Sequence, residues 1–405
     1  MMQYIIVFLY LFCFYAAARR KWLMLLLTIF LFSLLISGNM FNENILKYKK
    51  NLGLFLLPVF LCYTIVIFYT YAFLKNYGFI GVFLYAFLLT LLSFLELFIP
   101  LNPLIVLYGD IAKFLPKTDI PILNLLVLNL IPAIAFSLKL SFLYRFLVLV
   151  FVFLLTYKSP GNITHNPLNI VVIQVGLYFK KTGFRDNLYY DLNAFIKEKK
   201  VDLIIFSENV FFGHKNDYIK EKTNYFLTQM KDDRFNHKYG VLMNFYGYND
   251  INNVVTAFWH QDSFLLHQKS KLIPFFEKKG FFNSHEPLKS PFIFYDKKHS
   301  NQNIFNLKNT KISVHICYEG LFPEVLSQNS NISVVQSDYL RLDNGYNYDN
   351  VLIKGSILSK FSVAPNTPFI NVQNYGGTVL INKNWEVDMD LFYKSKTEPF
   401  LFIRM

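Results

Sequence analysis

Cysteine is scarce in this sequence, which holds three among 405 residues. Cys13 and Cys62 lie in long apolar runs, so Cys317 is the only cysteine in the C-terminal half of the chain. No disulfide can therefore form within that half. Cys317 is either a small packed side chain or a reactive thiol.

Two other kinds of site lack their usual patterns. The histidines, which include His260, His267, His285 and His315, do not follow the spacing of metal ligands. The chain has no Walker motif and no glycine motif of a dinucleotide-binding fold. We therefore expect neither a metal ion nor a cofactor.

Acidic residues are nearly absent from the first 157 residues, whereas the rest of the chain alternates charged and apolar segments. Overall, 54% of the residues are hydrophobic and the mean hydropathy is +0.31, which favours a membrane protein. The net charge is +13, but the lysines are scattered. This distribution argues against a nucleic-acid partner and suits anionic lipid headgroups.

Six apolar runs in residues 1–157 predict a helical domain that crosses a membrane about six times. The runs are 2–18, 22–37, 52–74, 77–99, 122–138 and 140–157. Residues 100–121 are interrupted by proline and charge, and they predict a re-entrant or interfacial segment. Glu96, at the end of an apolar run, is either a functional intramembrane acid or a side chain that reaches headgroup water.

Basic residues in the short connections predict the orientation of this domain. They occur at Arg19–Lys21, at Lys75 and at the junction of the last two runs, near residues 139–145. If these connections are cytoplasmic, everything after the sixth run lies outside. The lysines within residues 47–50 argue against this orientation.

The C-terminal half predicts a second domain at 168–405, after a linker at 158–167. Short β-rich runs alternate with amphipathic helical stretches, which predicts a layered α/β domain with mixed sheets and an antiparallel part between 239 and 268. Strands are expected at 168–175, 201–208, 239–247, 253–260, 264–268, 311–319, 331–338, 368–374, 377–383 and in the final PFLFIRM, and helices near 186–199, 215–231, 321–328 and 347–362.

Three of these predicted strands lead into residues that make chemical sense together. Glu208 closes LIIFSE, Lys269 follows FLLHQ and Cys317 closes ISVHIC. A carboxylate can take the proton of a thiol, and a lysine cation can lower the pKa of the thiol and stabilise the oxyanion of a tetrahedral intermediate. The helix predicted over 321–328 would also favour the thiolate through its N-terminal dipole.

This order of residues resembles the nitrilase superfamily. QKSKLIPFFE at 268–277 is similar to the family's K-x-x-L-V-P-F-G-E segment, and VHICYEGLFPE at 314–324 is similar to its I-C-Y-E segment. A multispan region before such a domain, with SFLELF at 93–98, resembles the membrane-fused branch, the bacterial apolipoprotein N-acyltransferases. The resemblance implies that the second domain is an α-β-β-α sandwich.

Site roles also follow from this resemblance. It implies that Glu208 is the general base, Lys269 the lysine on the oxyanion side and Cys317 the acylated nucleophile. Glu277 and Glu319 match the family's supporting acids near the thiolate.

The activity implied by the resemblance is transfer of a fatty acyl chain from a phospholipid to an N-terminal α-amino group. The acceptor is a diacylglyceryl-cysteine lipoprotein, and the route is a ping-pong reaction through a cysteine thioester. The implied enzyme is a monomer without a cofactor or a nucleic-acid partner. It lies in the bacterial cytoplasmic (inner) membrane, with several spans and its catalytic domain on the periplasmic side.

Several positions depart from the family pattern. Ser207-Glu208-Asn209 replaces P-E-[ST], Ser337-Asp338-Tyr339 replaces N-D-[AG]-W-F, and Phe276 replaces a glycine. The family's final transmembrane helix and one N-terminal helix are not found. Two alternatives therefore stay open, namely a membrane-tethered amidase that acts on a small carbon–nitrogen bond, and an inactive homologue that uses the domain for binding.

Overall fold

The computed structural model divides the chain into two compact units. The first consists of Met1–Gly161, Phe322–Ser327 and Arg341–Asn366, and the second of Asn162–Leu321, Gln328–Leu340 and Thr367–Met405. The structure describes residues 2–38, 52–95, 102–111, 115–138, 140–156, 167–183, 187–214, 216–248, 251–273, 277, 303–324, 330–340 and 348–405. Two segments of the predicted C-terminal domain thus belong to the first unit.

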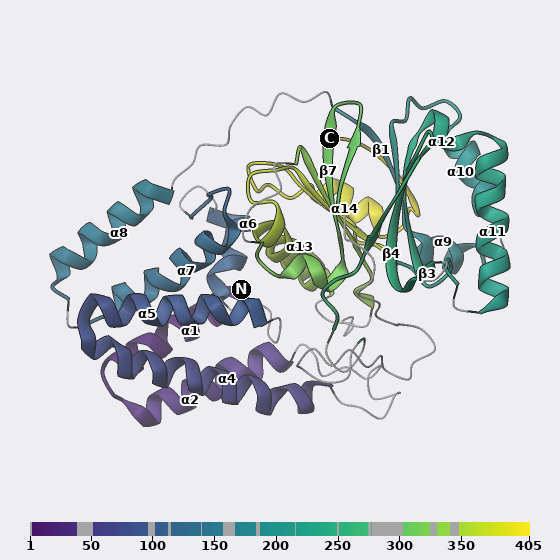
Figure 1. Ribbon diagram of the computed structural model, residues 1–405. Coiled ribbons are helices and arrows are strands. Elements are labelled where there is room, and N and C mark those ends of the chain that lie inside the picture. The colour runs from purple at the N-terminus through teal and green to yellow at the C-terminus, as the bar shows by residue number, and fades with distance from the viewer. Residues whose placement is uncertain are drawn as a thin grey trace. The chain divides into compact units, whose positions relative to one another are not determined.

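The first unit is helical, and each of the six apolar runs forms a helix (Figure 1). The helices are α1 (Met2–Ala18), α2 (Trp22–Gly38), α4 (Leu52–Leu74), α5 (Gly78–Leu91), α7 (Pro121–Ala135) and α8 (Phe142–Thr156). Aromatic rings fill its centre, where Phe14 meets the rings of Phe68 and Tyr71 edge to face at 5.2 and 4.8 Å. Such contacts stabilise a core beyond its buried area.

Short elements occupy the described part of the interrupted region at 100–121. They are the 3-10 segment η3 (Pro103–Leu107) and the single turn α6 (Tyr108–Ile111). The ring of Tyr108 packs on Phe361 of α13 (Tyr348–Val363), at 5.2 Å between centroids. Glu96 lies outside the described residues, as do residues 47–50 and most of the linker.

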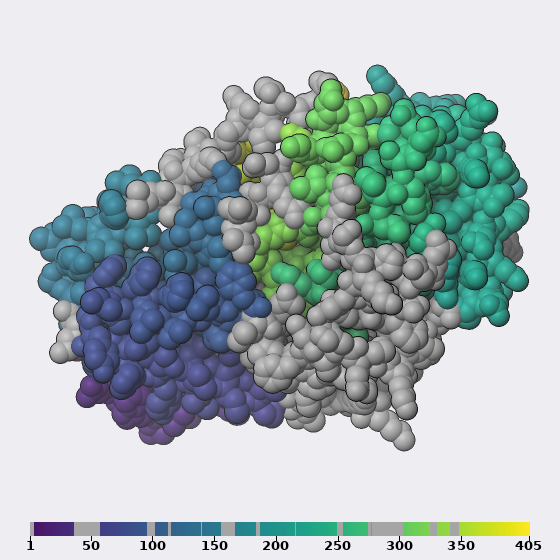
Figure 2. Space-filling view, in the orientation of Figure 1, coloured from purple at the N-terminus to yellow at the C-terminus, as the bar shows by residue number. Residues whose placement is uncertain are grey.

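By length and composition, one stretch, Leu57–Phe94, is apolar enough to cross a membrane. It contains most of α4 and all of α5, joined by the 3-10 turn η1 (Lys75–Tyr77). In the described part of the chain the other apolar helices are shorter than 18 residues, so the structure does not show a multispan bundle. Many large apolar side chains of this unit are nevertheless exposed, and Figure 2 shows α4 and α5, in dark blue, on its visible surface.

Two mixed sheets form the centre of the second unit, which confirms the predicted α/β class. The first sheet has the order β11-β1-β2-β3-β4-β5, and the second has the order β10-β9-β8-β7-β6. The strands are β1 (Asn169–Ile173), β2 (Leu203–Phe206), β3 (Gly240–Tyr248), β4 (Ile251–His260), β5 (Ser263–Gln268), β6 (Ile304–Leu307), β7 (Thr310–Ile316), β8 (Ile332–Ser337), β9 (Phe369–Gln373), β10 (Val379–Ile381) and β11 (Phe400–Arg404).

Strand direction follows from the connections. β1, β2 and β3 are parallel, as are β7, β8 and β9, whereas β3, β4 and β5 form the predicted antiparallel meander. The C-terminal strand β11 pairs with β1, with Ile173 opposite Phe400. The C-terminal ends of the parallel strands therefore lie at one edge of each sheet.

One apolar core lies between the two sheets, and another lies between the first sheet and the helices on its outer face. These helices are α9 (Val175–Thr182), α10 (Leu188–Ile196), α11 (Asp217–Asp232) and α12 (Phe235–Lys238) (Figure 1). Beside β10 packs the short α14 (Met389–Ser395). The predicted helix at 347–362 forms as α13, but it is grouped with the first unit, so the second unit by itself shows the layers α-β-β.

The helix predicted over 321–328 is wrong where the structure describes it. A 3-10 helix, η5 (Cys317–Leu321), comes first, and residues 322–324 are not helical. Pro323 explains the difference, because proline lacks an amide donor and disfavours helical backbone at the preceding residue. The sequence analysis also missed β6, α9 and α14.

Candidate active site

The structure brings together three residues from the ends of three strands. Glu208 lies two residues after β2, Lys269 directly follows β5, and Cys317 directly follows β7. The Lys269 Nζ lies 3.5 Å from Glu208 Oε1, and the Glu208 carboxylate lies near enough to the Cys317 thiol to raise the pKa of the thiol. All three are buried, with exposed fractions of 0% for Lys269, 2% for Glu208 and 6% for Cys317.

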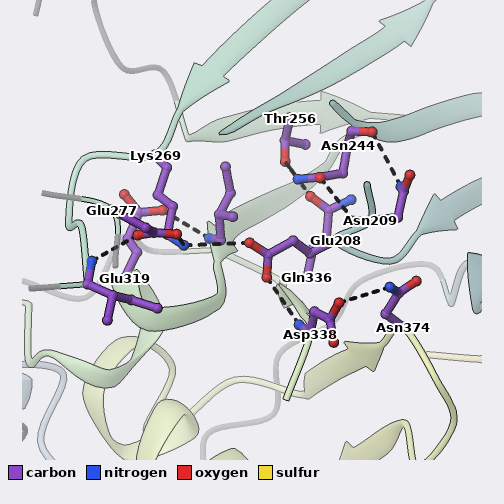
Figure 3. A network of polar contacts seen from close by, with 12 residues as sticks. Glu208, Asn209, Asn244, Thr256, Lys269, Glu277, Glu319, Gln336, Asp338 and Asn374 are labelled. Carbon is purple, nitrogen blue, oxygen red and sulfur yellow. Dashed lines mark hydrogen bonds and ion pairs between the residues drawn. The ribbon is translucent and has the colours of Figure 1, made fainter. Parts of the chain in front are cut away.

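Lys269 lies between two carboxylates. Its Nζ is 2.7 Å from Glu277 Oε1, and Glu277 Oε2 accepts a hydrogen bond of 2.8 Å from the Ile273 amide (Figure 3). Burial by itself lowers the pKa of Lys269, but Glu277 and Glu208 outweigh it and hold that pKa well above its usual range. Lys269 is therefore a fixed cation, as stabilisation of an oxyanion requires.

Glu208 has the environment of a proton-transfer group. Burial raises its pKa from 4.5 to about 7, although the nearby Lys269 cation opposes this rise. Its Oε2 accepts a hydrogen bond of 3.1 Å from the Asp338 amide, which fixes the carboxylate from the second sheet. A general base works best when its pKa lies near the working pH.

Cys317 adopts left-handed backbone, with φ of +47°. This conformation is uncommon for a residue with a side chain, and such backbone concentrates at functional sites. Burial and the Glu208 charge raise the pKa of the thiol well above its usual value, whereas Lys269 and the Asp338 amide lower it. The resting side chain of Cys317 is therefore a protonated thiol, and in the described residues 321–324 no α-helix begins whose N-terminus could favour a thiolate.

Glu319 holds the site together from one side of the triad. Its Oε2 bonds to His267 Nε2 at 2.8 Å and accepts from the Ile316 amide at 3.0 Å, and its Oε1 accepts from Ser270. Burial alone would raise the pKa of Glu319, but His267 and these hydrogen bonds keep it well below its usual range. The carboxylate thus ties the loop that carries Lys269 to the turn that carries Cys317.

Sequence reasoning treated Ser207, Asn209 and Asp338 only as departures from a pattern. The Ser207 hydroxyl lies 3.0 Å from Asn374 Oδ1 and accepts from the Val175 amide at 3.1 Å. Asp338 Oδ2 accepts from Asn374 Nδ2 at 3.1 Å (Figure 3). These contacts fix the loop after β2 and the end of β8, so the departures at Ser207 and Asp338 each have a local partner.

Sequence reasoning missed Asn244, Thr256 and Gln336 altogether. They lie on β3, β4 and β8, are completely buried, and form a polar row beside Glu208 (Figure 3). The available signal was a polar residue at an inward position of an otherwise apolar strand, as in VLMNFY and ISVVQS. Among the described residues, no group of three or more His, Cys, Asp or Glu is placed to hold a metal ion.

No family model matches the sequence, and no curated protein sequence matches it. Solved structures do resemble it. A carbon–nitrogen hydrolase from Helicobacter pylori G27 is 14% identical, covering 59% of this chain and 89% of that chain, with a TM-score of 0.41. Nit3 of Saccharomyces cerevisiae, from branch 10 of the nitrilase superfamily, is 11% identical, covering 61% of this chain and 92% of that chain, with a TM-score of 0.38. An amidase from Nesterenkonia sp. is also 11% identical, covering 56% of this chain and 88% of that chain, with a TM-score of 0.37.

Its structural neighbours are thus nitrilase-superfamily enzymes of low identity.

Proposed function

We propose that this chain is a membrane-anchored N-acyltransferase that moves a fatty acyl chain from a phospholipid to the α-amino group of a diacylglyceryl-cysteine lipoprotein. One observation carries the proposal. The chain that holds the buried cluster of Glu208, Lys269 and Cys317 also carries apolar helices with large exposed apolar side chains. Lipid substrates explain why both belong to one protein.

The reaction follows from the geometry of the cluster. Cys317 Sγ attacks the ester carbonyl carbon while its proton passes to Glu208, and Lys269 stabilises the resulting oxyanion. The carbon–oxygen bond then breaks, and Glu208 returns the proton to the leaving alcohol of the lysophospholipid. In the second half an amine attacks the thioester carbonyl and gives a proton to Glu208. The carbon–sulfur bond then breaks, and Glu208 returns the proton to the leaving sulfur, so that the amide is released and the Cys317 thiol re-forms.

Exposed apolar side chains support a lipid environment for the helices. A soluble protein rarely exposes large contiguous apolar patches. On α8, eight large apolar side chains are more than a third exposed, and α5 has six. They are Phe142, Leu143, Tyr144, Phe146, Leu147, Val150, Phe151 and Leu154 on α8, and Ile80, Phe83, Leu84, Phe87, Leu88 and Leu91 on α5.

The positions of basic residues support a catalytic domain on the outer face of a bacterial inner membrane. Lys75 donates to carbonyl oxygens at the end of α1, and Arg145 donates to Ala135 at the end of α7, at 2.8 Å. Phe14 of α1 stacks on Phe136, which follows α7. The three basic connections therefore lie at one end of the first unit, and α8 begins at that end and leads away from it to Thr156. If the basic end is cytoplasmic, the second unit is outside.

Mass spectrometry after incubation with phospholipid tests the proposed activity. We expect a fatty-acyl adduct on Cys317, and its release by a diacylglyceryl peptide with a free N-terminus but not by the same peptide with an acetylated N-terminus. A Cys62→Ala variant is the matched control and should keep the adduct, because Cys62 lies on α4 of the first unit. Hydrolysis of small amides without any acyl adduct would instead identify an amidase.

Location is tested separately. A membrane-impermeant label should reach a cysteine introduced at exposed Tyr218 in intact spheroplasts. Labelling of that position only after lysis would refute the outer location.

A further inference from the structure

A row of buried polar side chains crosses between the two sheets next to Glu208. Asn244, Thr256 and Gln336 occupy inward positions on β3, β4 and β8, and none has any exposed surface. One inward position farther from the site, the same strands carry core residues, namely Leu242, Phe258 and Val334. The core thus changes from apolar to polar one step before the catalytic edge.

Hydrogen bonds connect this row to both sides of Glu208 (Figure 3). Asn244 Nδ2 donates to the Thr256 hydroxyl at 3.4 Å, and that hydroxyl donates to Gln336 Oε1. Gln336 Nε2 then donates to the carbonyl of Phe206, two residues before Glu208, at 2.6 Å. The row therefore joins the second sheet to the last residue of β2.

The other end of the row fixes the residue after Glu208. The Asn209 amide donates to Asn244 Oδ1 at 3.3 Å, and Asn209 Nδ2 donates to the carbonyl of Ser207 at 2.9 Å. Asn209 Oδ1 in turn accepts from the amides of Phe211 and Phe212. The backbone is thus bonded immediately before and immediately after the proposed base.

Polar groups at these positions need an explanation, because apolar side chains could continue the core without any buried hydrogen bond to satisfy. A buried polar group destabilises a fold unless its partners are in place, and a satisfied network makes one geometry rigid. The network also includes Gln336 of β8, and Asp338 directly follows this strand. The amide of Asp338 donates to Glu208 Oε2 at 3.1 Å. One network therefore sets the relative position of the strand before the base and the strand that supplies its amide donor.

We propose that Thr256 and Gln336 are positioning residues, which hold the Glu208 carboxylate against the Cys317 thiol from across the two sheets. The inference rests on the proposed role of Glu208 as the base for Cys317. Loss of the row would let the end of β2 move relative to β8. Misplacement by about 1 Å can cost roughly a hundredfold in rate.

Thr256→Val and Thr256→Ser form the matched pair of variants for the test. Valine has nearly the shape of threonine and removes the hydroxyl that links Asn244 to Gln336, whereas serine keeps it. In the full-length Cys62→Ala protein, we would measure the rate of Cys317 alkylation by iodoacetamide from pH 5 to 10, with mass spectrometry of the Cys317 peptide. The single-turnover rate of acylation by a p-nitrophenyl ester would be measured over the same range.

For the parent protein and Thr256→Ser, both rates should rise with the ionisation of Glu208, near pH 7. For Thr256→Val, the rates at pH 7 should fall about tenfold to a hundredfold, and the rise should move to higher pH, because the thiol then ionises without a well-placed base. Ser313→Ala is the control for stability alone. It breaks a buried hydroxyl pair with Ser330, 3.1 Å apart, at the far end of β8, and should leave the pH profile unchanged.

An unchanged rate and pH profile in Thr256→Val would overturn the inference, as would an equal shift in Ser313→Ala. If Thr256→Val does not fold, Gln336→Met repeats the test from the second sheet, since methionine keeps the length and removes both bonds. Failure of the proposed function gives a different result. Phospholipid would then leave no adduct on Cys317, while the alkylation profiles would still report whether the row couples Glu208 to the thiol.

Discussion

Replacement of Glu208 by glutamine should remove activity and, at alkaline pH, stabilise the protein. Glu208 is 2% exposed, and burial raises its pKa from 4.5 to about 7. Above pH 7 the folded chain therefore holds a buried carboxylate that the unfolded chain exposes to water. Glutamine has the shape of the protonated acid and never ionises, so Glu208→Gln removes this cost of folding.

The sign and size follow from proton linkage. Between pH 4.5 and 7 the folded state binds more protons than the unfolded state. The free energy of unfolding is therefore highest below pH 4.5 and falls as the pH rises through 7. A pKa rise from 4.5 to about 7, at about 1.4 kcal/mol for each pH unit, lowers the free energy of unfolding above pH 7 by about 3 kcal/mol. Glu208→Gln should be more stable than the parent by up to that amount at pH 8, and by almost nothing at pH 4.5.

Thermal unfolding of the purified full-length chain at pH 5 and pH 8 measures this difference. One kcal/mol corresponds to roughly 2–4 °C for a unit of about 200 residues, so the midpoint at pH 8 should rise by about 6–12 °C. Glu398→Gln is the matched control, because this acid is about half exposed in its pair with Lys394, and its midpoint should change little.

Two outcomes would refute the reasoning. If Glu208→Gln were no more stable than the parent at pH 8, or equally stabilised at pH 5, burial would not be the origin of the raised pKa. If the variant formed the thioester at the normal rate, Glu208 would not be the base.

Four further predictions concern single residues. Lys269→Met should slow thioester formation by roughly a hundredfold to a thousandfold in single-turnover assays, and should lower the unfolding temperature, because two buried carboxylates lose their cation. Cys317→Ala should abolish the acyl adduct in mass spectra and leave the unfolding temperature within a few degrees of the parent. Gly213→Ala should destabilise the protein in urea unfolding, because φ is +145° and a Cβ atom would lie 2.2 Å from the Tyr246 carbonyl oxygen. Glu319→Gln should weaken both folding and acylation rate, since a charge-assisted pair that joins the two catalytic loops is lost.

The sequence predicted the strands well where hydrophobicity decides them. β2 is buried on both faces, and LIIF is apolar throughout, so its type and position were predictable. The β3–β4–β5 meander followed from short connections between β-rich runs. By contrast, α13 packs with η3 and α7 of the first unit, and no local pattern in residues 348–363 could assign it to the other end of the chain.

Residue type and spacing predicted the members of the triad but not its geometry. Motif spacing placed Glu208, Lys269 and Cys317 at strand ends, and the structure brings them together. Glu319 was expected near the thiolate, and its bonds to His267 and Ser270 became visible only once β5 and β7 were placed in space. Hydrogen bonds across two sheets depend on sheet stacking, which sequence periodicity does not encode.

The pKa of Glu208 also bears on the second half of the proposed reaction. An α-amino group has a pKa of about 7.7–8, so passing its proton to a carboxyl of pKa 4.5 is uphill by about 4–5 kcal/mol. Passing it to a carboxyl with a pKa of about 7 is uphill by only about 1 kcal/mol. Burial of Glu208 thus lowers the cost of proton transfer from the acceptor by about 3 kcal/mol, the same amount by which it destabilises the fold at alkaline pH. A neutral side chain at position 208, as in Glu208→Gln, recovers this stability but cannot accept the proton of the amine. Such a variant should therefore lose the aminolysis step.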